Sequence, residues 1–427
     1  MNKLKERVLQ LLGNKKAHIA MFFVYYVLMT VEYWNFVCRN FPHLHFHWTC
    51  SAVTVVCGFL LLAALAFLIF KLKPSSSFAY ALSVFVAVLF CVPAIIFFQF
   101  GNGSIFPCIY SLLFTFLISS SLIKIPTFPS PVVPQRFQVP VLLVLALLAL
   151  IPFVVVFGFD VNFNVFSMGL EIYDVRAAAR ARTTTLTAYL FGPLVKVLLP
   201  LLLVYGVARK KWLVVAFAAV AMLYIFLVNP HKAVFLSLFL VLIFCLFDDY
   251  NLKAGFILFG VVLMVAASAL VTLVMGNILP ESILVRRMFF VPAQLSSVYF
   301  SFFENNHIYL SHSVLKHFFD YPYELDPPHL IGWYMYGRTN VSCNTGFIGD
   351  GYMNFGHFGA LLFTLGTAVV FRFFESVKMR PLFFGVVLLT LFTFLNSAFL
   401  TSLLTHGVFF FMLIALFFLK TDNDFEK

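Results

Sequence analysis

Arginines gather in a short polar stretch of an otherwise apolar chain. Arg176, Arg180 and Arg182 lie in the run EIYDVRAAARARTTT. In a helix, Tyr173, Arg176 and Arg180 share one face, whereas Arg182 points elsewhere. Guanidinium groups bind phosphate oxygens through paired hydrogen bonds and stay charged at any relevant pH. The stretch predicts a short helix that binds an anion such as a diphosphate, the alternatives being lipid headgroups or acids of the same run.

A second polar region runs from about residue 276 to 354. It opens with Arg286 and Arg287, followed by the apolar segment MFFVPAQLSSVYFSFF. This pattern is typical of a helix lying in the membrane interface or of a re-entrant piece, which would hold both arginines at headgroup depth. The remaining candidates for substrate binding in this region are polar, charged or glycine residues: Arg338, Glu324, Asp326, His317, Asn344, Gly349 and Asn354.

A general base is also expected in the second region. Asp350 is the first candidate because glycines flank it in TGFIGDGYMNFGHFG and would allow a sugar to approach closely. The alternative is an aspartate that accepts hydrogen bonds from backbone amides in a turn. His312 is the second candidate. Glu324 and Asp326 could also hold a divalent cation. No metal or cofactor motif stands out, however, and we expect neither a bound metal nor a cofactor.

The elements that position these residues are membrane-spanning helices. Hydrophobic residues make up 62% of the 427 positions and charged residues 11%, too few to give a soluble domain its polar surface. We predict an all-α bundle of about twelve transmembrane helices, because lipid leaves unpaired backbone groups unsatisfied. The expected spans are 17–37, 51–71, 78–98, 104–123, 139–159, 186–208, 212–228, 232–247, 254–275, 355–373, 381–398 and 401–419.

The distribution of basic residues predicts the orientation of the bundle. With both termini in the cytoplasm, 18 of the 28 Lys and Arg residues lie on the inner side, as the positive-inside rule requires. Residues 1–427 then form a single membrane domain with two functional loops on the outer face, 160–185 and 276–354. Lys196 lies deep in a span between two prolines, where an ionisable group usually faces a cavity. We therefore count it among the substrate-binding candidates.

At this point a resemblance to a known family appears. The many spans, the arginine-bearing loops, the RRMFFVPAQ segment and the glycine-rich TGFIGDGYMNFGHFG resemble the Wzy-type O-antigen or capsule polymerases. The specific part of this resemblance covers about residues 286–359. Arg338 and Gly349 also resemble a spaced arginine and glycine of outer loops in some members, whereas the Arg176 to Arg182 cluster departs from that pattern.

The resemblance implies a GT-C-like inverting glycosyltransferase of the bacterial inner membrane, acting in lipopolysaccharide biosynthesis. Such an enzyme transfers a growing glycan from undecaprenyl diphosphate to the terminal sugar of a lipid-linked repeat unit at the periplasmic face. It also implies a chain-length regulator as a partner, and no nucleic acid. Arginines stabilise the charge that develops on the leaving diphosphate, and we expect Arg176, Arg180 and Arg287 in that role.

Two other functions remain open on the sequence. One is the related chemistry of an O-antigen ligase, and the other is a flippase for lipid-linked oligosaccharides. A flippase is expected to show repeated halves and ionisable residues strung across the bundle. Here the polar residues concentrate in two loops, which favours an enzyme that works from one face of the membrane.

Overall fold

The computed structural model describes residues 2–72, 74–126, 130–163, 165 and 171–420, which form helices and their connections without any strand. For residues 2–5, 7, 8, 171–174, 232, 233, 235 and 236, only the backbone is described. Each of the twelve predicted ranges coincides with helix, which confirms a helical membrane protein. Eight of the described helices are long and apolar enough to cross a membrane, and the number of spans stays a prediction.

The chain, predicted as one membrane domain, divides into two compact units. Unit 1 comprises residues 1–124, 249–372 and 394–399, and unit 2 comprises residues 125–248, 373–393 and 400–427. Each unit is assembled from segments that are far apart in the sequence. The 160–185 region belongs to unit 2, and the 276–354 region belongs to unit 1.

Unit 1 is built around a long helix, α14 (Tyr250–Met275), which packs against α1 (Asn2–Gly13), α2 (Lys15–Glu32) and α5 (Ser77–Val86). The helix that contains α5, Ser77–Phe100, is apolar on every side and entirely buried, as expected for a helix in the middle of a bundle. The other helical elements of this unit up to residue 346 are η1 (Tyr33–Val37), α3 (Cys38–Asn40), η2 (Pro42–Leu44), α4 (Ala52–Phe70), η3 (Ala87–Cys91), α6 (Val92–Phe100), α7 (Phe106–Ser119), α15 (Leu279–Glu281), η6 (Ser282–Phe290), α16 (Val291–Phe302) and α17 (Pro327–Tyr336).

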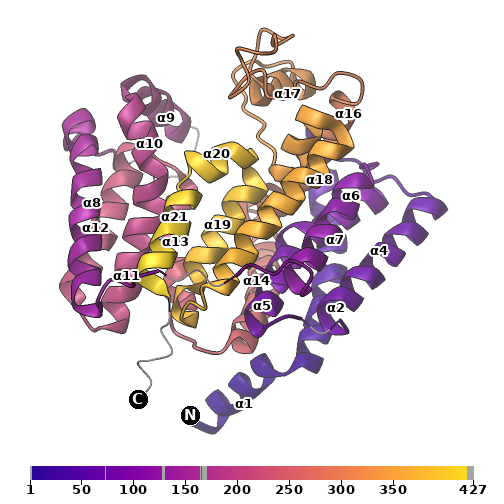
Figure 1. Cartoon of the computed structure of the whole chain (residues 1–427). Coiled ribbons are helices and arrows are strands. Elements are labelled where there is room, and N and C mark those ends of the chain that lie inside the picture. The colour runs from indigo at the N-terminus through magenta and orange to yellow at the C-terminus, as the bar shows by residue number, and fades with distance from the viewer. Residues whose placement is uncertain (1, 73, 127–129, 164, 166–170, 421–427) are drawn as a thin grey trace. The chain divides into compact units, whose positions relative to one another are not determined.

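Unit 2 is a second bundle, in which the helix Thr185–Ala208 is central. Its last part, α11 (Leu199–Ala208), packs against α8 (Gln135–Phe157), α12 (Trp212–Val228) and α13 (Lys232–Phe244), and Figure 1 shows these helices side by side. The other elements that lie wholly or partly in this unit are α9 (Glu171–Arg182), α10 (Thr185–Gly192), η5 (Pro193–Leu198), η7 (Pro381–Phe383), α19 (Phe384–Asn396), α20 (Phe399–Leu404), α21 (Val408–Ile414) and η8 (Ala415–Leu419).

The polar 276–354 region of unit 1 is folded and has its own apolar core. Tyr299 and Phe303 from the end of α16 pack with Ile331 of α17 and with Met353, and all four side chains are buried. The hydroxyl of Tyr299 donates a hydrogen bond to the carbonyl of Cys343 at 2.9 Å. Apolar burial of this kind removes side chains from water and fixes the backbone between them. The region is therefore an ordered part of unit 1.

The helix α18 (Phe347–Ser376), which contains the glycine-rich motif, is sharply kinked. Phe355 and Gly356 have non-helical backbone angles, and Gly356 has a φ of 60°, which favours glycine. The kink brings Gly351 and Gly359 so close that a Cβ on Gly351 would lie 2.4 Å from the carbonyl oxygen of Gly359. The chain thus turns sharply at Gly356, whereas Gly351 and Gly359 are required for close packing.

Candidate anion-binding site

The arginine stretch forms the predicted helix, α9, in unit 2. Arg176 and Arg180 are four residues apart and therefore lie on one face of α9. The Nε of Arg176 donates a hydrogen bond to the carbonyl of Pro230 at 2.6 Å, and this bond places the end of the Arg176 side chain beside the connection between α12 and α13. Arg180 is exposed. The side chain of Tyr173, which we predicted on the same face, lies outside the described residues.

Three further basic side chains converge on this region. His231 follows Pro230 and lies close enough to Arg176, Arg180 and Lys196 for their charges to act on its ring. His406 is in turn close enough to Lys196 and His231 to be affected by both. We call these five residues the basic cluster: Arg176, Arg180, Lys196, His231 and His406.

Close backbone packing brings His406 next to the helix of Lys196. A Cβ on Gly192 would lie 2.6 Å from the Cα of His406, and Gly407, with a φ of 84°, packs directly against Pro193. Pro193 opens the π-helical segment η5, which carries Lys196. The ring of Phe191 contacts that of His231, with centroids 5.0 Å apart. Glycine is needed at both contact points because any side chain would separate the two chain segments.

The electrostatics of the basic cluster disfavour further positive charge. His231 keeps exposed surface, yet enclosure by protein and then the charges of Arg176, Lys196 and Arg180 lower its pKa to about 4. The ring is therefore neutral near pH 7. Lys196 makes no hydrogen bond or ion pair with any described residue. The Nδ1 atom of His406 is buried and likewise has no hydrogen-bond partner in the described part of the chain. This arrangement can hold an anion, which would relieve the repulsion.

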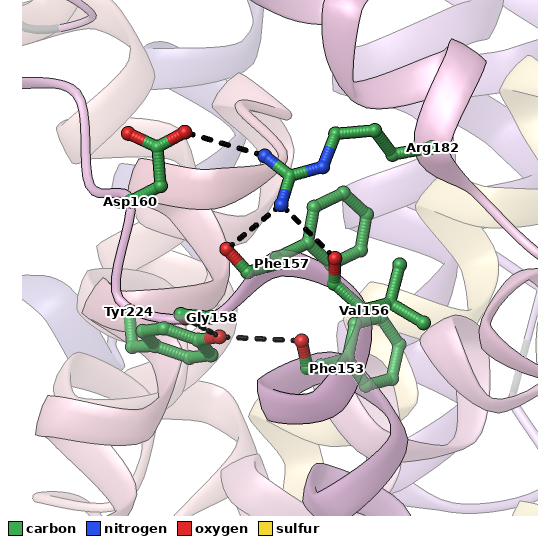
Figure 2. Close-up of polar contacts among 7 residues, drawn as sticks. All are labelled: Phe153, Val156, Phe157, Gly158, Asp160, Arg182 and Tyr224. Carbon is green, nitrogen blue, oxygen red and sulfur yellow. Dashed lines mark hydrogen bonds and ion pairs between the residues drawn. The ribbon is translucent and has the colours of Figure 1, made fainter.

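Arg182 faces away from the basic cluster and has a different set of partners. Its guanidinium group donates to the carbonyls of Val156 and Phe157 at 3.0 and 3.1 Å and pairs with Asp160 at 3.3 Å (Figure 2). These carbonyls belong to the last turn of α8, where a cation interacts favourably with the helix dipole. Arg182, which we predicted to bind substrate, fastens the end of α8 to the end of α9.

Asp350, the predicted base, lies in a buried hydrogen-bond network of unit 1. Its Oδ2 accepts from the backbone N–H of Phe399 at 2.7 Å, and its Oδ1 accepts from the side-chain amide of Asn354 at 3.0 Å. The Oδ1 of Asn354 accepts in turn from the N–H of Leu310 at 2.8 Å. Both residues are at most 3% exposed. These hydrogen bonds fix the start of α20 and the turn at Leu310. Asp350 thus accepts a backbone hydrogen bond, as in the alternative to a general base that the sequence left open.

The two adjacent arginines of η6 differ in their surroundings. Arg286 is buried, donates to the hydroxyl of Ser282 at 3.1 Å and stacks on the ring of Phe41, 4.2 Å from its centroid. Arg287 is exposed. A guanidinium group that stacks on an aromatic ring contributes to packing as well as to charge. Arg287 therefore lies at the surface of unit 1, whereas Arg286 holds η6 against the segment near Phe41.

The other predicted residues of the 276–354 region have contacts of their own. Asp326 pairs with His329, and its side chain is exposed. Gly349 allows close packing, since a Cβ there would lie 2.3 Å from the hydroxyl of Thr345. His312 packs near Tyr321, and its pKa is lowered by burial, so its ring is neutral at pH 7. Four further candidates have exposed side chains: His317, Glu324, Arg338 and Asn344.

The structure thus joins three predicted residues, Arg176, Arg180 and Lys196, and adds two that sequence reasoning missed. His231 and His406 are single histidines in short connections between apolar helices. Their positions along the sequence follow no regular interval that would relate them to the arginines of α9. A histidine beside a proline or glycine at a helix boundary was the only available signal.

The described residues include no group of three or more His, Cys, Asp or Glu side chains that could hold a metal ion. Comparisons with protein-family models, with curated proteins and with solved structures found no match to this chain.

Proposed function

We propose that the protein is a glycan polymerase that uses a polyprenyl-diphosphate-linked donor. It transfers a growing oligosaccharide from undecaprenyl diphosphate to the terminal sugar of a lipid-linked repeat unit, at the periplasmic face of the bacterial inner membrane. The observation that carries this proposal is the basic cluster of unit 2, in which Arg176 and Lys196 act on the same histidine ring in a membrane-spanning bundle. A lipid-linked diphosphate fits both features, because its negative charge can bind the basic cluster and its apolar tail can lie in the membrane-spanning bundle.

The proposed reaction is an inverting displacement. The oxygen of an acceptor hydroxyl attacks the anomeric carbon of the donor glycan, and the bond from that carbon to the diphosphate oxygen breaks. The electron pair of this bond stays on the diphosphate, while the hydroxyl proton passes to a base. Charge grows on the leaving group, so cations already in place lower the barrier, by about 3 kcal/mol for a single well-placed donor.

The three cationic residues of the basic cluster each have a part in this proposal. Arg176 is oriented by its hydrogen bond to the Pro230 carbonyl, and its guanidinium group supplies a positive charge at the connection between α12 and α13. Arg180, one turn further along α9, is exposed and adds a second planar donor group. Lys196, on η5, supplies a compact positive charge. Two guanidinium groups and one ammonium balance the charge of a diphosphate.

Reconstitution tests the proposal directly. The purified protein in lipid vesicles is incubated with one repeat unit linked to undecaprenyl diphosphate, without nucleotide. We expect a ladder of longer lipid-linked glycans and released undecaprenyl diphosphate. Movement of the intact substrate across the bilayer without elongation would replace the polymerase by a flippase. Elongation only when a lipid A core is added, with a single transfer, would replace it by a ligase.

A further inference from the structure

The basic cluster has a feature that the proposed reaction does not use. His231 is neutral and His406 has a buried Nδ1 without a hydrogen-bond partner among the described residues, although both lie beside permanent cations. Buried polar atoms nearly always have a partner, so an unsatisfied nitrogen points to a ligand or water that completes the site. Both histidines therefore belong to the place where an anion would bind.

The surroundings of His231 define what a bound anion would change. Arg176 donates a hydrogen bond at 2.6 Å to the carbonyl of Pro230, the residue before His231, and the close packing of Gly192 against His406 brings His406 to the helix of Lys196. The charges of Arg176 and Arg180 on α9 and of Lys196 on η5 act on the ring of His231, and His406, in the connection before α21, lies close to Lys196 and His231. All these neighbours are basic, and the charges of Arg176, Arg180 and Lys196 make protonation of the ring less favourable. A diphosphate among them would offset these charges. An opposite charge within a few ångströms favours the charged form of an imidazole.

We propose that His231 takes up a proton when a diphosphate binds in the basic cluster, with His406 donating or accepting a hydrogen bond at the same ligand. This inference rests on the proposed function only for the identity of the ligand, a polyprenyl diphosphate. The proton acquired by His231 comes from solvent and stays on the imidazole while the anion is bound. This proton adds a positive charge to the site while the diphosphate is bound. The proton is lost again when the product leaves.

Calorimetry of ligand binding tests the proposal. Farnesyl diphosphate is titrated into the detergent-solubilised protein at about pH 6, in two buffers that differ in ionisation enthalpy, and the difference in heat gives the number of protons taken up. The ligand has its own titrating proton, so the informative quantity is the difference between the wild-type protein and His231→Gln. We expect the wild type to take up close to one proton more than the variant.

The pH dependence of affinity gives a second measure. Relative to His231→Gln, the wild-type affinity should rise as the pH falls from 7 to 5, by up to about tenfold per pH unit. His406→Gln should weaken binding and keep the extra proton. Equal proton uptake by the wild type and His231→Gln would overturn the inference, as would the absence of binding.

The outcome for this inference is independent of the outcome for the polymerase. If a preparation elongates glycans but shows no His231-dependent proton uptake, the polymerase proposal stands and the proton uptake is refuted. If it binds farnesyl diphosphate with His231-dependent proton uptake but never elongates a glycan, the proton uptake stands and the polymerase proposal is refuted. Arg136→Ala serves as the control in both assays, because Arg136 is exposed and stacks only on the ring of the neighbouring Phe137 among the described contacts.

Discussion

Asn354 donates a side-chain hydrogen bond to Oδ1 of Asp350 at 3.0 Å, and both residues are buried in unit 1. The pair connects three pieces of chain, because Asp350 also accepts from the N–H of Phe399 and Asn354 also accepts from the N–H of Leu310. Buried polar groups in such a network depend on each other, since the loss of one partner leaves the next without a bond. The network stabilises unit 1 next to the glycine kink of α18.

Replacement of Asp350 separates a structural role from a catalytic one. Asp350→Ala leaves the Phe399 N–H and the Asn354 amide unsatisfied, and we expect it to cost about 2–4 kcal/mol of stability. Asp350→Asn keeps an acceptor for Phe399 but opposes its NH2 group to that of Asn354, so we expect a smaller loss of stability than in Asp350→Ala, and glycan elongation should continue. If Asp350→Asn instead abolished elongation while the protein stayed folded, the carboxylate would be the general base predicted from the sequence.

The arginines of α9 should be required for elongation and dispensable for folding. We expect Arg176→Ala and Arg180→Ala to reduce the rate of chain lengthening at least a hundredfold, because each removes a charge from the leaving diphosphate. Arg176→Lys should also be impaired, since an ammonium cannot form the paired bonds of a guanidinium group. The measurement is the glycan length distribution in cells, with membrane levels of each variant compared. A normal ladder from both alanine variants would refute their role.

Lys196 should show opposite effects on stability and activity. Its ammonium has no hydrogen bond or ion pair with a described residue, and it lies close to His231 and His406. Lys196→Met keeps the length of the side chain and removes a charge without a partner among the described residues, so it should stabilise the protein by about 1 kcal/mol while weakening diphosphate binding. Thermal unfolding and farnesyl diphosphate titration check both effects. A destabilised Lys196→Met with unchanged affinity would contradict the assignment.

The stability of the ligand-free protein should fall in mild acid because of His231. The pKa of this residue is about 4 in the folded protein, below the ordinary histidine value of 6.5, so the unfolded chain binds more protons between these values. Unfolding is therefore favoured as the pH drops from 7 towards 4. We expect the unfolding temperature of His231→Gln to decline less than that of the wild type over this range. Parallel declines would show that other groups govern the acid sensitivity.

The kink of α18 should tolerate no side chain at Gly356. This residue has a φ of 60°, and a Cβ would lie 2.7 Å from Nε2 of His307. Gly356→Ala should cost about 1–3 kcal/mol from backbone strain alone, with the contact to His307 adding to it. The matched control is Gly260→Ala in α14, where a Cβ meets nothing within 4 Å and the substitution should be neutral or stabilising. Equal unfolding temperatures of both variants would contradict this account.

The sequence by itself determined the class of the protein and the local geometry of its polar segments. The apolar composition required membrane helices because lipid leaves no other way to satisfy the backbone. The helical period placed Arg176 and Arg180 on one face and Arg182 on another, and the structure agrees. Such features depend on residues within one or two turns of each other, which a pattern along the chain can express.

Only the tertiary structure decided which distant residues meet. His231 and His406 join Lys196 through the packing of Gly192 and Gly407, and nothing in the intervening apolar helices encodes that pairing. Likewise, the glycines around Asp350 do not specify its partners, and only the fold brings the backbone N–H of Phe399 to its carboxylate. Apolar helices pack through similar surfaces on many sides, so their order in space, and with it the position of each polar group, follows from the whole fold.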